Sequence, residues 1–218
     1  ATMLTSQYPS ALGVGPFADP GRLSEAAVTL AEVFRQHGFA TAAITGGYVS
    51  RQLGFDQGFD SFQATPDTPS MAYTVTYADE WLERRDTARP FFLFLHTFEV
   101  HQYRPPEEFR RRWVRPYEGS LGELENVQAF VQSAANQERV RELGAEDWRY
   151  LRDLYDACLA SVDSEIGRLL EVLQARGLRE TTLVVVTSDH GEEFGEHGGS
   201  GHGYTLYDEN QRLPLLLN

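Results

Sequence analysis

Apolar residues follow two different spacings along this chain. Four short segments are rich in apolar and β-branched residues and predict strands: 39–45, 90–96, 181–187 and 213–217. The segment 90–96 is apolar on both faces, as in a parallel sheet covered by helices. Three longer segments repeat apolar residues at helical spacing: 24–37, 73–85 and 148–175. Because helices and buried strands alternate, the sequence predicts an α/β fold with a mostly parallel central sheet flanked by helices.

The residues at the ends of these segments support the boundaries. Ser24 is a suitable N-cap for the first of the three helices, and Gly38 follows its predicted last residue, His37. The remaining segments predict a short helix that stops before Pro9, a Gly- and Phe-rich loop over 46–62, a long loop over 97–120 with a helix start at Pro106, and a weakly patterned helix over 121–143.

Polar residues follow three of the predicted strands. Thr45, His96 and Asp189 each stand at or just beyond the carboxyl end of a strand. Ligands of parallel α/β sheets bind outside the carboxyl ends of the strands. We therefore expect these three residues to lie near one functional site.

Asp189 and His190 are the first candidates for chemistry. Together they offer one hard oxygen and one imidazole nitrogen at the end of a buried strand, which suits a divalent metal ion such as Mn²⁺, Zn²⁺ or Ca²⁺. The alternative is that Asp189 caps the turn and His190 is a hydrogen-bonded surface residue. The preceding strand and the nearby glycines, which let the backbone approach an ion, favour the metal.

Composition excludes several classes of function. The net charge of −13 argues against a nucleic-acid or anionic-membrane surface. All 19 basic residues are arginine, so no lysine Schiff base can form. The single cysteine, Cys158, excludes an internal disulfide and a multi-cysteine zinc site. No signal peptide is visible and no apolar run is long enough to span a bilayer.

Several motifs resemble the sulfatase branch of the alkaline phosphatase superfamily. Segment 188–198, SDHGEEFGEHG, is followed by GHGYTLYDE at 201–209 and RLPLLL at 212–217. Residues 1–9, ATMLTSQYP, resemble the segment just after that family's nucleophile motif, Cys/Ser-x-Pro-Ser-Arg. Residues 91–101, FFLFLHTFEVH, resemble the strand that leads into its His-x-Pro loop.

This resemblance implies a metal-dependent hydrolase of sulfate esters with an alkaline-phosphatase-like fold and a small anionic ester as substrate. Asp189 and His190 match the family's metal-ligand pair, and His101 matches the histidine that contacts the anionic group or the leaving oxygen. His202 stands where sulfatases place a sulfate-binding lysine. A histidine binds an anion only when protonated or through one neutral hydrogen bond, so we expect weaker or pH-dependent anion binding.

The resemblance also implies that the nucleophile and some of the metal ligands lie outside this sequence. The chain begins without an initiator Met and ends within a predicted strand, so we expect residues 1–218 to be a single incomplete catalytic domain, truncated at both ends. The nucleophile, which sulfatases convert to formylglycine, and an Asp pair that completes the metal site would lie upstream. The fragment alone is therefore expected to be inactive, and an exported or periplasmic location is implied by resemblance only.

Two departures leave alternatives open. Residues 46–49, GGYV, replace a Gly-Lys-Trp-His motif that is frequent in sulfatases, and His190 is also common in phosphonate and phosphodiester hydrolases. One alternative is therefore a phosphodiesterase, a phosphonate monoester hydrolase or a phosphoethanolamine-type transferase. The other is a catalytically silent module that binds anions or serves assembly. The sequence alone does not separate sulfate from phosphate esters or identify the metal.

Other polar residues have simpler expected roles. His96 could face the site or be a hydrogen-bonded core residue. The acids of the 188–198 loop could support the metal ligands, although most loop acids are solvated: Glu192, Glu193 and Glu196. His197 is expected to be structural, and Arg110, Arg111 and Arg112 are expected to form a solvated helix face.

Overall fold

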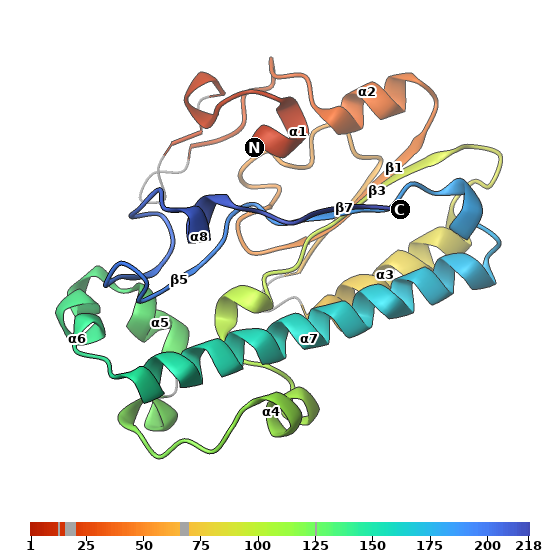
Figure 1. The fold of residues 1–218 in the computed structure, drawn as a ribbon. Helices are drawn as coiled ribbons and strands as arrows, with labels where there is room; N and C mark the ends of the chain where they lie inside the picture. The colour runs from red at the N-terminus through yellow and green to blue at the C-terminus, as the bar shows by residue number, and fades with distance from the viewer. Residues whose placement is uncertain (13, 16–20, 66–69, 125) are drawn as a thin grey trace. The chain divides into compact units, whose positions relative to one another are not determined.

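The chain forms two units in the computed structural model, residues 1–98 and residues 99–218. The structure describes residues 1–12, 14–15, 21–65, 70–124 and 126–218 (Figure 1). Each unit has its own buried apolar cluster. Whether both belong to one incomplete domain stays a prediction.

A parallel sheet forms the centre of the N-terminal unit. Its strands are β1 (Ala40–Gly46), β2 (Ser61–Thr65) and β3 (Phe91–Leu95), in the order β2-β1-β3. Every residue of β1 is buried, and Ala42 pairs with Ser61 on one side and with Leu93 on the other. Since α2 and α3 both contact β1, this unit confirms the predicted α/β class with a parallel sheet flanked by helices.

The helices of this unit differ in how well the sequence predicted them. They are α1 (Thr2–Thr5), the 3₁₀ helix η1 (Pro9–Ala11), α2 (Leu30–Gln36) and α3 (Met71–Arg84). Helix α3 begins two residues before the predicted Tyr73, because the Ser70 side chain accepts a hydrogen bond from the Tyr73 backbone amide.

The predicted start of a helix at Ser24 was wrong. Helix α2 begins at Leu30, because Thr29 and Glu32 form a capping box in which each side chain accepts a hydrogen bond from the other's backbone amide. Ser24 caps only a turn, where its hydroxyl accepts from the Ala26 amide.

The predicted loop over 46–62 runs into a strand that the sequence analysis missed. Strand β2 has only five residues, and the loop before it packs against the start of α2. A Cβ at Gly58 would lie 2.4 Å from the Glu32 backbone nitrogen, and Gly58 has a φ of +91°. Only glycine therefore allows this approach, which brings Phe59 and Phe62 into the core.

One long helix forms the centre of the C-terminal unit. It is α7 (Ala145–Ala175), 31 residues, and it matches the predicted 148–175 closely. The unit also contains α4 (Glu107–Trp113), α5 (Val127–Gln132), α6 (Gln137–Arg141), α8 (Asp208–Gln211) and the 3₁₀ helices η2 (Val100–Gln102), η3 (Ser120–Glu123), η4 (Ala134–Asn136) and η5 (Arg179–Thr181). The weakly patterned segment 121–143 is thus broken into short helices.

The core of this unit lies between α7 and the chain segments around it. Helix α4 packs along α7 (Figure 1). The Asp153 carboxylate of α7 is buried and accepts hydrogen bonds from the Arg115 backbone amide at 3.1 Å and from its guanidinium at 2.9 Å. Arg149 also donates to Asp153 at 3.1 Å. This buried acid therefore holds the segment after α4 against α7.

Two small antiparallel ribbons complete the C-terminal unit. Strand β4 (Val185–Thr187) pairs with β7 (Leu215–Leu217), and β5 (Glu193–Phe194) pairs with β6 (Ser200–Gly201). The strand predicted over 181–187 is shorter than expected, since η5 takes up Thr181 and the strand begins at Val185. The β5–β6 hairpin was not predicted.

Candidate active site

The predicted metal-ligand pair stands on the turn that follows β4. The Asp189 Oδ1 atom lies 3.7 Å from the His190 Nε2 atom, and the two side chains are 60% and 36% exposed. The His190 Nδ1 atom lies 2.8 Å from the Gly191 carbonyl oxygen. A carbonyl only accepts, so Nδ1 carries the proton and Nε2 keeps its lone pair. One carboxylate oxygen and one imidazole lone pair side by side fit a divalent cation.

Glycine at position 191 fixes where this turn lies. A Cβ there would lie 1.9 Å from the Glu209 carbonyl oxygen. The Gly191 amide donates to the Asn210 carbonyl at 3.0 Å, and the Glu192 amide donates to the Glu209 carbonyl at 3.1 Å. The turn is therefore tied to α8, and any larger residue at 191 would separate the two.

The two predicted catalytic histidines lie beside this pair. The His202 ring stacks on the His190 ring, with centroids 3.8 Å apart and an interplanar angle of 26°. The His101 ring meets the His202 ring edge-on, with centroids 5.1 Å apart. The structure thus brings together His101, His190 and His202, which come from η2, the β4 turn and the segment after β6.

His101 is held in a neutral form. The Gln128 side-chain amide lies 2.8 Å from the His101 Nδ1 atom, which accepts its proton, so the His101 proton stands on Nε2. Burial, together with the neighbouring His202 and His190, lowers the pKa of His101 to about 4. The proton-bearing Nε2 atom of His101 also lies 3.5 Å from the Gln132 side-chain amide nitrogen.

Two of the three loop acids are buried rather than solvated. Glu192 and Glu193 are 8% and 2% exposed. The Glu192 carboxylate lies 3.2 Å from the His202 Nδ1 atom. The third acid, Glu196, remains partly exposed and pairs with Arg152. Sequence reasoning had no signal that separated these neighbours, because the β5–β6 hairpin that directs them was not predicted.

A second group of possible ligand atoms lies between the β5–β6 hairpin and α8. One atom each of Glu193, His197 and Glu209 lie within 4.8 Å of one another. The Glu193 carboxylate already accepts from the Gly199 amide at 2.9 Å and from the Thr205 hydroxyl at 3.2 Å, and His197 Nδ1 lies 2.6 Å from Glu209. These bonds connect the hairpin to α8, and the structural role expected for His197 stays a prediction.

Thr45 and His96 lie at adjacent strand ends in the N-terminal unit. The Thr45 hydroxyl donates to the Val49 carbonyl at 2.6 Å, and the His96 amide donates to the Ile44 carbonyl at 2.9 Å. The first of these bonds closes the turn after β1. Their expected proximity to Asp189 stays a prediction.

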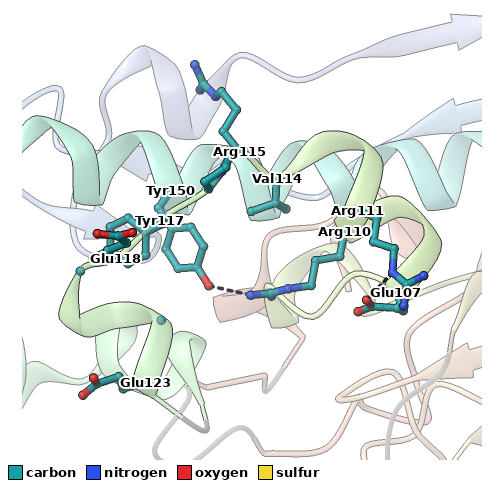
Figure 2. A pocket seen from close by; sticks show the side chains of 12 residues that line it. Glu107, Arg110, Arg111, Val114, Arg115, Tyr117, Glu118, Glu123 and Tyr150 are labelled. Atoms are coloured by element: carbon teal, nitrogen blue, oxygen red, sulfur yellow. Dashed lines mark hydrogen bonds and ion pairs between the residues drawn. The ribbon is translucent and has the colours of Figure 1, made fainter.

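A groove of about 480 Å³ lies between α4, residues 114–119 and α7 (Figure 2). Figure 2 shows Arg110 donating to the Tyr150 hydroxyl, at 3.0 Å, and Arg111 paired with Glu107, at 2.7 Å. The predicted solvated face is confirmed, since the three consecutive arginines 110–112 are all exposed. Three arginines and three glutamates line the groove, so its charge does not favour an anion: Arg110, Arg111, Arg115, Glu107, Glu118 and Glu123.

Comparison with known proteins decides the family. The family model described as Sulfatase matches residues 1–218. The chain belongs to the sulfatase family. The mouse iduronate 2-sulfatase is 31% identical over 160 residues, which are 62% of this chain and 28% of that protein. This sulfatase segment spans less than a third of the length of the curated relatives it matches.

Solved structures show the same fold. A protein solved in complex with its substrate D-glucosamine-2-N,6-O-disulfate matches all of this chain and 60% of its own, with a TM-score of 0.72 and 20% identity. The phosphonate monoester hydrolase of Agrobacterium radiobacter matches 99% of this chain and 57% of its own, with a TM-score of 0.73 and 19% identity. The predicted alkaline-phosphatase-like fold is therefore confirmed. Among the described residues, no helix is both long and apolar enough to cross a membrane.

Proposed function

We propose that the full-length protein is a metal-dependent hydrolase of sulfate esters. The observation that carries this proposal is the meeting of Asp189 and His190 with His202 and His101 at one place in the C-terminal unit. Membership of the sulfatase family supports the reaction type.

Each of these residues has a proposed role. Asp189 and His190 hold the divalent metal, which when bound acts as a Lewis acid toward the ester. The neutral His101 donates a hydrogen bond from Nε2 to the anionic group or to the leaving oxygen. His202 contacts the anionic group from the other side. A formylglycine nucleophile would come from outside these 218 residues.

A sulfated sugar is the substrate class that a structural neighbour suggests. That neighbour was solved with a glucosamine disulfate. Half-buried imidazoles without a lysine provide single hydrogen-bond donors rather than a strong positive charge, which suits a monoanionic sulfate ester better than a dianionic phosphate. An exported location is part of the proposal, as in the family.

The second candidate is hydrolysis of a phosphonate monoester or a phosphodiester. These esters are also monoanions, and the A. radiobacter phosphonate hydrolase has a TM-score as high as the sulfated-sugar neighbour's. The chain's own His190 and His202 are compatible with both reactions.

Metal content and turnover of matched variants test the proposal. Asp189→Asn in the full-length protein should remove the bound metal and sulfate release together, whereas the exposed Asp208→Asn should change neither. Inductively coupled plasma mass spectrometry and ion chromatography measure the two quantities. Full metal occupancy and turnover in Asp189→Asn would rule out the proposed metal site, and a wild-type protein inactive on sulfate and phosphonate esters alike would indicate the silent module.

A further inference from the structure

Glu192 is a buried carboxylate in the wall of the candidate site. Its side chain is 4% exposed, and it follows the metal-ligand turn by two residues. Ionised carboxylates are seldom buried unless several donors satisfy their oxygens. Its partners therefore indicate what Glu192 does.

Two side chains meet this carboxylate. The His202 Nδ1 atom lies 3.2 Å from Oε2 and 3.4 Å from Oε1. The Tyr103 side chain is also hydrogen-bonded to Glu192, and burial, followed by the charge of Glu192, raises the pKa of Tyr103 well above its usual value. The Tyr103 hydroxyl therefore stays protonated and donates a hydrogen bond to the Glu192 carboxylate.

Tyr103 is held in an unusual backbone conformation to make this contact. It is 3% exposed and has a φ of +52°, in the left-handed region that non-glycine residues rarely occupy. Tyr103 directly follows the 3₁₀ helix that carries His101. The same short backbone segment therefore places both His101 and the Tyr103 hydroxyl, which is hydrogen-bonded to Glu192.

A carboxylate on Nδ1 determines the state of His202. An ionised carboxylate only accepts hydrogen bonds, so Nδ1 carries a proton and Nε2 is the atom left for a ligand. The ring is also confined between the His190 face and the His101 edge. Its rotation and its tautomer are therefore both fixed by neighbours.

We propose that Glu192 and Tyr103 are positioning residues that hold His202 as the Nδ1–H tautomer and direct Nε2 to the anionic group of the substrate. The Nδ1–H tautomer of His202 follows from its contact with Glu192 alone. Only the role of Nε2 toward the substrate rests on the proposed function. The adjacent Glu193 is different, because it accepts from the Gly199 amide and the Thr205 hydroxyl and has no histidine ring nitrogen bonded to it.

Nitrogen NMR of the histidine side chains tests the tautomer directly. In chelator-treated full-length protein with ¹⁵N-labelled histidine, the neutral His202 ring should show its proton on Nδ1. Glu192→Met keeps the buried volume but removes the acceptor, and should move the signal toward the tautomer mixture of free imidazole. Glu192→Gln retains an acceptor oxygen and should restore most of the Nδ1–H form. The partly exposed Glu196→Gln is the matched control and should change nothing.

Kinetics test the consequence for substrate. Glu192→Met should lower kcat/KM by about 10–100-fold, the range for residues that orient a functional histidine. In a His202→Ala background the same change should cost nothing further, since Glu192 acts through His202. A proton found on Nε2 in the wild type, a signal unmoved by Glu192→Met, or additive losses in the double variant would each overturn the proposal. A protein with no sulfatase turnover would contradict the proposed function and leave the NMR result to decide the tautomer.

Discussion

The His190 and His202 ring centroids lie 3.8 Å apart in a stack, although the two residues are twelve positions apart in the sequence. The β5–β6 hairpin accounts for this, because its two strands return the chain to the turn where it began. One ring belongs to the proposed metal-ligand pair and the other to the proposed anion contact. The segment from the β4 turn to the end of the β5–β6 hairpin thus carries both the proposed metal ligands and one proposed contact to the anionic group.

The metal should bind at Asp189 and His190 rather than at the Glu193 cluster. Asp189→Asn removes a charged ligand oxygen and should weaken binding of Mn²⁺ or Ca²⁺ by at least about tenfold, as loss of a ligand does. His197→Ala should leave the metal affinity within about twofold. Isothermal titration of both variants separates the sites, and the opposite order would place the ion at the Glu193 cluster.

His202 should contribute to substrate binding. His202→Ala in the full-length protein should lower kcat/KM for a sulfate ester by about 10–100-fold, because one hydrogen-bond donor to the anion is lost. His202→Lys supplies a permanent charge and should recover part of this loss. Steady-state kinetics measure both, and an unchanged kcat/KM in His202→Ala would exclude the contact.

His101 should remain neutral at physiological pH. Burial, with the nearby His202 and His190, lowers its pKa from 6.5 to about 4. As the pH falls below about 6.5, the unfolded chain takes up this proton before the folded one, so stability falls between about pH 6.5 and 4 and is unaffected above that range. A proton NMR titration of His101 in metal-free protein should give a midpoint near pH 4. A midpoint above pH 6 would contradict the burial of His101 and its hydrogen bond with the Gln128 side-chain amide.

The start of α2 should depend on Thr29. Its hydroxyl accepts from the Glu32 amide and donates to the Gln57 carbonyl at 3.0 Å. Thr29→Ala should lower the free energy of unfolding by about 1–2 kcal/mol, whereas Thr29→Ser keeps the cap and should cost less than about 0.5 kcal/mol. Urea denaturation measures both values. Equal losses would show that the methyl group, not the hydroxyl, provides the stability.

Strong local patterns in the sequence predicted most of the regular structure. The long apolar stripe of α7 and the run at 91–95 were placed closely, because burial on a helix face or in a sheet leaves a clear spacing. The start of α2 was misplaced because Ser24 was taken as the cap, although Thr29 with Glu32 three residues later has the capping-box pattern that Ser24 lacks.

The candidate site was predicted in part for a similar reason. The four residues singled out by motif resemblance, Asp189, His190, His101 and His202, come together in the structure. Glu192 could not be separated from its neighbours Glu193 and Glu196, because a two-residue strand leaves no periodicity by which to tell which side chain turns inward. The left-handed conformation of Tyr103 leaves no sequence signal of the kind that a glycine gives.

The choice between sulfate and phosphonate esters tests the central claim most directly. The full-length protein should be assayed on two monoanionic aryl esters that share one leaving group, 4-nitrophenyl sulfate and 4-nitrophenyl phenylphosphonate, with release of nitrophenol as the readout. A sulfatase should give a kcat/KM at least about tenfold higher for the sulfate, and Asp189→Asn should abolish it. A higher kcat/KM for the phosphonate, or sulfate turnover that survives Asp189→Asn, would contradict a metal-dependent sulfatase.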